Sequence, residues 1–152
     1  MRGTSERLIR MLEAIVLDGQ LAADAAQEAY VQLYLHWDEV RVAGEPEAWL
    51  YRVAVNRCKD YRRRLVRGRR LFRRLVATAP PLATEDGPES IDDFFAVLRK
   101  LPVRQRTAVA LFYQGDMSIV EISHLMGISE GAVNSHLNRA RRSLKKTLEA
   151  RR

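Results

Sequence analysis

Apolar side chains recur every three or four positions along most of this chain, whereas no alternating apolar run reaches a useful length. The first spacing is typical of amphipathic helices. It predicts one helix that begins after Thr4 or Ser5 and ends near 18–19, a second over 24–37 and a third over 46–62. A proline suits the first helical turn, which is where Pro46 falls. The predicted buried stripe of the second helix consists of Ala26, Tyr30, Leu33 and Trp37.

A change of composition divides these helices from a second helical group. Residues 77–90 contain three prolines, small residues and acids, which is typical of a linker. Beyond it the pattern predicts a helix that begins at Ser90 or Asp92, and another over 101–115. The chain is therefore predicted to be all-α, with two small helical domains at residues 1–76 and 91–152.

The segment 118–144 shows the strongest local signals. Ser118 is followed three positions later by Glu121, which is the spacing of a capping box at a helix start. Gly127 can end that helix in the left-handed conformation, and Ser129 can cap the next one. Two short helices around a tight turn form a helix-turn-helix, whose second helix can enter the major groove of DNA.

The second helix of this motif has a narrow apolar stripe and a wide polar surface. The stripe is Val133, Leu137, Ala140 and Leu144. The other faces carry Asn134, Ser135, His136, Asn138, Arg139, Arg141 and Arg142. Amides and arginines together suit base edges and phosphates. The alternative interpretation is an ordinary helical hairpin with a solvated basic face.

Charge supports a nucleic-acid partner. The 152 residues have a net charge of +7, and eleven basic residues lie between Arg52 and Arg74 beside the single acid Asp60. Trp49, Tyr51 and Tyr61 lie at the start of this run, and aromatic residues beside cations are typical of single-stranded DNA binding. A solvated or flexible charged segment is the alternative. Membrane-surface binding would call for a lone basic amphipathic helix, and no window is apolar enough to span a bilayer.

Residue chemistry argues against an enzyme. The sequence has no glycine-rich phosphate loop, and its three histidines do not pair with each other or with Cys58 at metal-ligand spacing. Neither Ser129 nor Ser135 has a nearby histidine and acid for nucleophilic catalysis. We therefore expect no catalytic residue, metal or cofactor. The single cysteine, Cys58, fits a reducing cytoplasm and a packing role.

Three segments, taken in order, resemble an extracytoplasmic-function (ECF) sigma factor of bacterial RNA polymerase. They are D-A-A-Q-E-A-Y at 24–30, P-E-A-W-L-Y-R-V-A-V-N-R at 46–57, and the helix-turn-helix at 118–144. The resemblance implies that residues 1–76 form sigma region two and residues 91–152 form region four. It implies a subunit that binds core RNA polymerase and directs promoter recognition, promoter opening and transcription initiation.

The resemblance also implies roles for individual residues. Docking on core RNA polymerase would fall to Asp24, Gln27, Glu28, Tyr30 and Leu33. The minus-10 element, opened and held as single-stranded DNA, would contact Trp49, Arg52, Asn56, Arg57, Lys59, Arg62 and Arg63. The minus-35 duplex would be read by Ser129, Asn134, Ser135, His136, Asn138, Arg139 and Arg142. In this last set the amides and Ser135 would face bases, and His136 with the arginines would face phosphates.

The same resemblance implies an anti-sigma factor as a further partner and a place in the bacterial cytoplasm without membrane insertion. The sequence departs from the family at Ser123, where alanine is common, at Asn134, where a basic residue is common, and in a short N-terminal part. The competing hypothesis is a stand-alone helix-turn-helix regulator that binds duplex DNA without polymerase. A third is an interaction protein that only holds polymerase or an anti-sigma factor.

Overall fold

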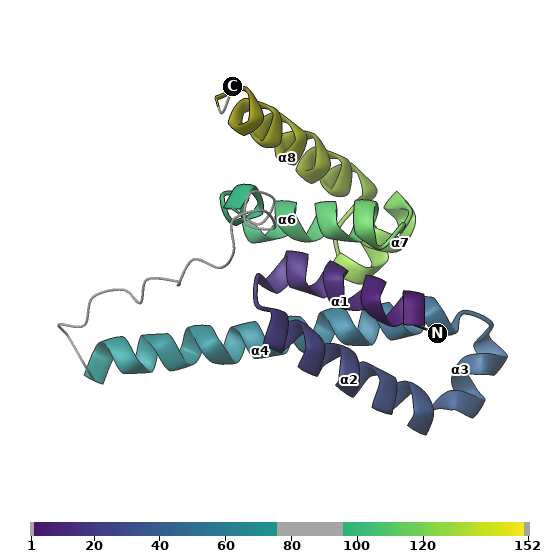
Figure 1. Cartoon of the computed structure of the whole chain (residues 1–152). Helices are drawn as coiled ribbons and strands as arrows, with labels where there is room; N and C mark the ends of the chain where they lie inside the picture. Colours follow the sequence, from purple (N-terminus) through teal and green to yellow (C-terminus); the bar gives the residue numbers. More distant parts are fainter. Residues whose placement is uncertain (1, 76–95, 151–152) are drawn as a thin grey trace.

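The structure is a computed structural model that describes residues 2–75 and 96–150 (Figure 1). All regular elements in these ranges are helical, which confirms the predicted all-α class. They are α1 (Arg2–Val16), α2 (Gly19–Leu35), α3 (Trp37–Ala43), α4 (Pro46–Leu75), α6 (Val103–Val109), the π-helical turn η1 (Ala110–Gln114), α7 (Ile119–Met126) and α8 (Glu130–Ala150). The predicted linker at 77–90 and the helix start at Ser90 or Asp92 lie outside the described residues.

The second predicted helix was wrong at both ends. The side chain of Asp18 accepts hydrogen bonds from the backbone N–H groups of Gln20 and Leu21, so α2 already begins at Gly19. It ends at Leu35, and Trp37 begins the separate helix α3 with 47 % of its surface exposed. The buried stripe of α2 is instead Ala22, Ala25, Ala26 and Ala29. These small side chains allow α2 to approach α1 and α4 closely.

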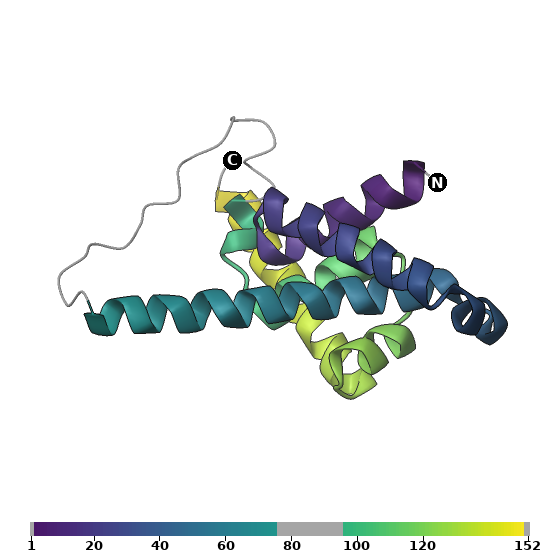
Figure 2. The ribbon, with the colours of Figure 1, turned by 90° about the horizontal axis from the view of Figure 1, so that it is seen from below.

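Helix α4 is longer than the apolar pattern predicted. It continues from Arg62 to Leu75 through the arginine-rich segment and extends away from the other helices in Figures 1 and 2. Arginine and leucine have good helix propensity because their unbranched stems lose little rotamer freedom in a helix. The apolar pattern ended earlier because the extension is rich in charge.

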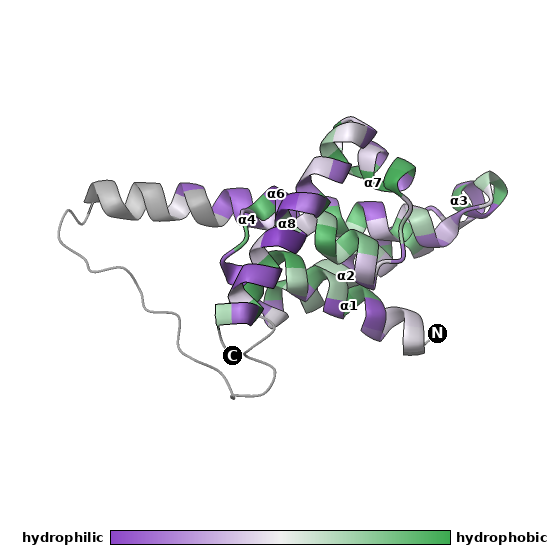
Figure 3. Ribbon diagram, turned by 90° about the horizontal axis from the view of Figure 1, so that it is seen from above, coloured by the Kyte–Doolittle hydropathy of each residue, from purple (hydrophilic) through white to green (hydrophobic). Residues whose placement is uncertain are grey.

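The helices form two groups with α1 between them. The N-terminal group consists of α2, α3 and α4, and the C-terminal group consists of α6, η1, α7 and α8. One face of α1 packs against α2 and α4, and it also contacts η1 and α6 from the C-terminal group. Leu8, Met11 and Leu12 of α1 are completely buried, and they belong to one apolar cluster with Val55 of α4 and Leu111 of η1. Figure 3 shows apolar residues where these helices meet and hydrophilic residues along the outer side of α8. The two groups therefore share a continuous core in the described residues.

Candidate nucleic-acid interface

The local signals of the helix-turn-helix are confirmed in detail. Ser118 Oγ accepts a hydrogen bond from the backbone N–H of Glu121 at 3.1 Å, and donates to the Glu121 carboxylate at 3.1 Å. Gly127 has φ +67°, which is the left-handed conformation that ends α7. Ser129 Oγ accepts from the backbone N–H of Ala132 at 3.1 Å and so caps α8. These three positions fix where α8 begins relative to α7.

Packing decides which side of α8 is available. Val133, Leu137 and Ala140 are buried against α6 and α7, as the apolar stripe predicted. The opposite side is open, because Asn134, Ser135, Asn138, Arg139 and Arg142 are exposed. Hydrogen-bonding amides and guanidinium groups thus lie together on the free face of a rigid helix. Such a face can place donors and acceptors in a major groove.

Two polar residues on α8 are less available to a ligand than the others, because one is half-buried and one contacts η1. His136 is half-buried, and its Nδ1 has no hydrogen-bond partner. Arg141 Nε donates to the hydroxyl of Tyr113 at 2.8 Å, and its guanidinium lies 5.8 Å from the ring centres of Phe112 and Tyr113. Arg141 therefore anchors α8 on η1. It also donates a longer hydrogen bond to Asn138 Oδ1, at 3.4 Å.

The predicted minus-10 residues all lie on α4 but not in equivalent surroundings. Arg52 and Asn56 are exposed one helical turn apart, and Trp49 is half-buried with its ring 5.8 Å from that of His36. Arg57 forms a 3.5 Å ion pair with Glu28 of α2. Lys59, Arg62 and Arg63 lie further along α4, on the wall of a cavity that faces α6. Lys59 and Arg62 are half-buried there, whereas Arg63 is exposed.

Burial and like charge act together on this last group. Burial lowers the pKa of the Lys59 ammonium, and the neighbouring Arg63 and Arg104 guanidinium groups lower it further. Arg52 and Asn56, nearer the start of α4, are exposed. The cationic surface of α4 thus has an open end near Trp49 and a crowded end near Lys59.

The predicted polymerase-binding residues also differ in how exposed they are. Asp24 and Gln27 are exposed on α2, whereas Tyr30 and Leu33 are half-buried and pack against the core. Glu28 accepts a hydrogen bond from the Tyr61 hydroxyl in addition to its ion pair with Arg57. This hydrogen bond to a carboxylate, followed by burial, raises the pKa of Tyr61. Glu28 therefore ties α2 to α4.

An exposed apolar surface beside Asp24 and Gln27 was missed by the sequence reasoning. Val31, Tyr34 and Leu35 on α2 are 51 %, 82 % and 65 % exposed. Their signal was present in the sequence, since three apolar residues lie off a stripe of small alanines on the same helix. The predicted stripe had instead assigned burial to larger residues. Exposed apolar patches commonly mark protein interfaces.

These features define an all-helical DNA-binding protein with a helix-turn-helix at its C-terminal end and a basic, aromatic-bearing helix in its N-terminal half. Two comparisons with protein families agree with this class. Residues 3–68 match Sigma-70 region 2, and residues 91–144 match Sigma-70, region 4.

Relatives and a solved structure extend the comparison. The chain is 30 % identical over 154 residues to the RNA polymerase sigma-E factor of Streptomyces avermitilis, which covers 99 % of this chain and 84 % of that protein. It is 30 % identical to the ECF RNA polymerase sigma factor SigM of Bacillus subtilis, over 90 % of this chain and 85 % of that one. The fold is similar to that of the sigma factor RpoE from Bartonella quintana, in a complex with the anti-sigma factor NepR. That match has a TM-score of 0.74 at 22 % identity, and covers 98 % of this chain and 94 % of that chain.

The chain belongs to the sigma-70 family of RNA polymerase sigma factors, and its relatives place it among the ECF sigma factors. It is therefore a non-enzymatic initiation factor that binds core RNA polymerase and directs promoter recognition and transcription initiation. Among the helices in the two described ranges, none combines the length and apolarity needed to cross a membrane.

Proposed function

We propose that this sigma factor recognises its promoter with two separate surfaces, one for each promoter element. In this proposal residues 1–76 dock on polymerase and hold the opened minus-10 strand, 77–90 form a linker, and 91–152 read the minus-35 duplex. The observation that carries the proposal is the free polar side of α8, together with the exposed Arg52 and Asn56 on α4. A rigid helix suits a duplex groove, whereas amides, cations and aromatic rings suit unpaired bases.

On α8 the exposed amides Asn134 and Asn138 and the hydroxyl Ser135 are assigned to base edges. Arg139 and Arg142 are assigned to phosphates. Ser129 caps the helix close to the groove, and the half-buried His136 contacts the backbone from the margin of the surface. The distribution supports this division because the amide side chains lie between the cap and the arginines on one helix.

On α4 we assign Trp49, Arg52 and Asn56 to unpaired bases of the minus-10 strand. Arg57, Lys59, Arg62 and Arg63 then continue along the same helix as phosphate contacts. Arg57 would contact a phosphate in addition to its ion pair with Glu28. The assignment is supported by the shared helix α4, which carries all four cations after Asn56.

We assign polymerase docking to the outer side of α2. Asp24 and Gln27 offer polar contacts there, and Val31, Tyr34 and Leu35 add an exposed apolar surface. Leu33 and Tyr30 hold the helix on its own core, and Glu28 fixes α2 against α4 through Arg57 and Tyr61. We also propose an anti-sigma partner, because the structural neighbour is held by one, and action in the bacterial cytoplasm, where polymerase and promoters are found.

Reconstituted transcription with core polymerase tests the division between the two surfaces. Asn56→Ala should lower promoter opening about tenfold, because one base contact is worth roughly 1–3 kcal/mol, while binding of a minus-35 duplex stays unchanged. Arg139→Ala should weaken the duplex contact instead. Asp60→Ala is the matched control on the exposed side of α4. Equal effects of Asn56→Ala and Arg139→Ala on both readouts would refute the division, and tight specific duplex binding without polymerase would favour a stand-alone regulator.

A further inference from the structure

The free face of α8 carries two amide side chains whose surroundings differ. Asn134 and Asn138 are both exposed and lie about one helical turn apart, so they share one side of the helix. Oδ1 of Asn138 accepts a hydrogen bond of 3.4 Å from Nη1 of Arg141. None of the hydrogen bonds within residues 2–75 and 96–150 involves the side chain of Asn134. Only the Asn138 amide therefore has a neighbour that selects one of its two orientations.

The guanidinium group that faces Asn138 is held by η1, a different element. Nε of Arg141 donates to the hydroxyl of Tyr113 at 2.8 Å, across 28 positions of sequence. The same guanidinium lies 5.8 Å from the ring centres of Phe112 and Tyr113, a distance at which cation–π attraction acts. Two rings and one hydroxyl thus restrict a long side chain that would otherwise move freely on an exposed helix face. The donor beside Asn138 is therefore kept in place from outside α8.

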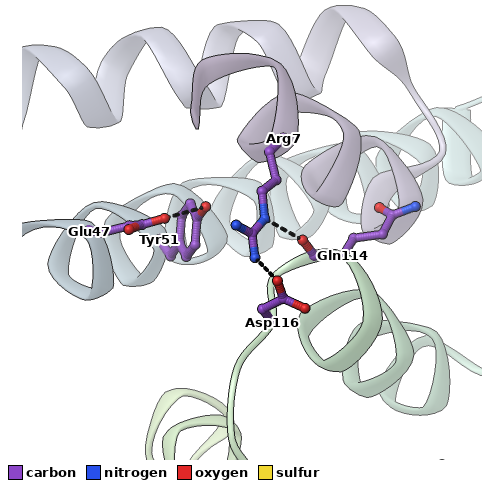
Figure 4. A network of polar contacts seen from close by, with 5 residues as sticks. All are labelled: Arg7, Glu47, Tyr51, Gln114 and Asp116. Atoms are coloured by element: carbon purple, nitrogen blue, oxygen red, sulfur yellow. Dashed lines mark hydrogen bonds and ion pairs between the residues drawn. The ribbon is translucent and has the colours of Figure 1, made fainter. Parts of the chain in front are cut away.

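This support lies within the C-terminal group and does not involve α1. Figure 4 shows Arg7 of α1 in contact with Gln114 and Asp116 at the end of η1. Neither Tyr113 nor Arg141 takes part in these contacts. In addition, η1 follows α6 without a break, and α8 packs on α6. The orientation of Asn138 thus depends on how α8 packs within its own group.

The chemistry of the two side chains decides which way the Asn138 amide points. A guanidinium group has five N–H donors and no acceptor, whereas an amide has an acceptor oxygen on one side and an NH₂ group on the other. Only the oxygen can therefore face Arg141. A reversed amide would place the Nδ2 hydrogens against a positive charge and leave the Nη1 donor unused. The NH₂ group of Asn138 is consequently the part that remains for a ligand.

An amide oriented in this way suits one purine better than the other. In the major groove guanine presents two adjacent acceptors, N7 and O6, whereas adenine presents the N7 acceptor beside the N6 donor. An unrestrained asparagine pairs with adenine through both its oxygen and its NH₂ group. Beside Arg141, adenine N6 competes with the guanidinium for the same oxygen. Guanine needs only the NH₂ group and meets no such competition.

We propose that Arg141, held by Tyr113, is a specificity-determining residue that orients the Asn138 amide toward guanine in the minus-35 element. The proposal rests on the base-reading role assigned above to Asn138. Arg141 acts through Asn138 and is therefore a positioning residue, and Tyr113 supports it from η1. Asn134 has no such neighbour, so its amide turns to fit either purine and is an internal comparison.

Sequencing of the promoter DNA that polymerase holoenzyme retains from a library with a randomised minus-35 element tests this proposal. Asn138→Ala identifies the base pair that Asn138 reads, because preference is lost there. At that base pair the wild type should favour guanine over adenine. Arg141→Met should shift the ratio of guanine to adenine about fivefold toward adenine, which corresponds to one hydrogen bond of a base contact. The base pair identified by Asn134→Ala should keep its preference.

The ratio between two sequences separates orientation from stability. Arg141→Met also loses its contacts with η1, but unfolded chains are lost equally from both sequences and cancel in the ratio. Tyr113→Phe keeps the ring of a residue that is 54 % exposed and removes only the hydroxyl, so it should cause a smaller shift at the same base pair. Lys145→Met removes an exposed cation of α8 and is the matched control, with every ratio unchanged.

The results distinguish this inference from the assignment on which it rests. A wild-type preference for adenine at the Asn138 base pair, or an unchanged ratio in Arg141→Met, would overturn the orienting role while Asn138 keeps its base contact. Even weakening of all sequences by Arg141→Met would also overturn that role, since it would indicate a phosphate contact. If Asn138→Ala changes no position, the base-reading role of Asn138 fails, and the orienting role fails with it.

Discussion

At the scale of single residues, charged groups on one helix differ in whether another helix engages them. Exposed Arg139 has no partner among the hydrogen bonds and ion pairs of the described residues, whereas Arg141 on the same helix is held by Tyr113. Glu28 is similarly engaged with Tyr61 and Arg57 of α4, whereas Asp24 is exposed and accepts a hydrogen bond from Gln20 of its own helix. We therefore expect substitution of a charged residue that no other helix engages to affect binding, and substitution of one that another helix engages to affect folding.

Arg139→Ala should weaken duplex binding at every sequence and reduce the slope of log K against log salt by about 1, because one phosphate contact and its released counterion are lost. Titrations of the wild type and the variant at several salt concentrations measure that slope. Arg99→Ala, an exposed arginine outside α8, serves as the control. An unchanged slope for Arg139→Ala would remove its phosphate role.

Stability should fall at alkaline pH because of Cys58. Burial raises the pKa of its thiol from 9.0 to about 12, so above pH 9 the unfolded chain loses this proton while the folded chain keeps it. The wild type should therefore lose about 1 kcal/mol between pH 7.5 and 9.8 through this group. Cys58→Ala should lack that part of the loss in urea denaturation. An identical loss in both proteins would contradict the assignment.

At the scale of elements, caps fix the helix-turn-helix, and the small alanines of α2 fix its distance from its neighbours. Ser118 and Ser129 each satisfy a backbone N–H at a helix start, and Gly127 makes the turn between them. Ser123 Oγ donates to the carbonyl oxygen of Val120 at 2.9 Å and so needs no outside partner. The motif is thus specified locally.

Ser118→Ala should destabilise the protein by about 1 kcal/mol, because the N–H of Glu121 loses its acceptor at the start of α7. Chemical denaturation measures the change. Ser143→Ala is a matched control, since Ser143 is exposed within α8 and its side chain has no cap to make. If the two substitutions cost the same, the cap does not contribute.

At the scale of the whole molecule, two groups of helices are joined into one core by α1. The polar contacts of this connection are those of Arg7 with Gln114 and Asp116 and those of the buried Arg106. Removal of Arg106 leaves the Ile15 and Leu101 carbonyl groups without its donor groups. The apolar part is the row of α1 side chains that contact both groups. We therefore expect the two groups to unfold together.

Arg106→Ala should destabilise the protein by about 3 kcal/mol and divide one calorimetric transition into two, because buried acceptors are left unpaired at the interface. Differential scanning calorimetry shows both effects. Arg104→Ala, next on α6 but exposed, should keep the single transition and relieve repulsion on Lys59. A single transition in Arg106→Ala would show that the apolar contacts suffice.

The sequence by itself determined the features that depend on neighbouring residues. Caps, the glycine turn and the 3.6-residue period predicted the helix-turn-helix and the apolar stripe of α8, since each of these signals acts within a few positions. The cationic character of α4 was equally visible. The break at His36 and the early start of α2 were missed because a buried stripe of alanines gives a weak hydropathy signal beside Tyr30 and Leu33.

Only the tertiary structure decided which of these polar residues are free. Arg106 and Arg104 are two positions apart on one short helix, yet one is buried against α1 and the other lines the cavity opposite Lys59. Glu28 and Asp24 differ in the same way on α2. Contacts between residues 7 and 116 or 15 and 106 depend on how distant helices pack, and no local pattern encodes that distance.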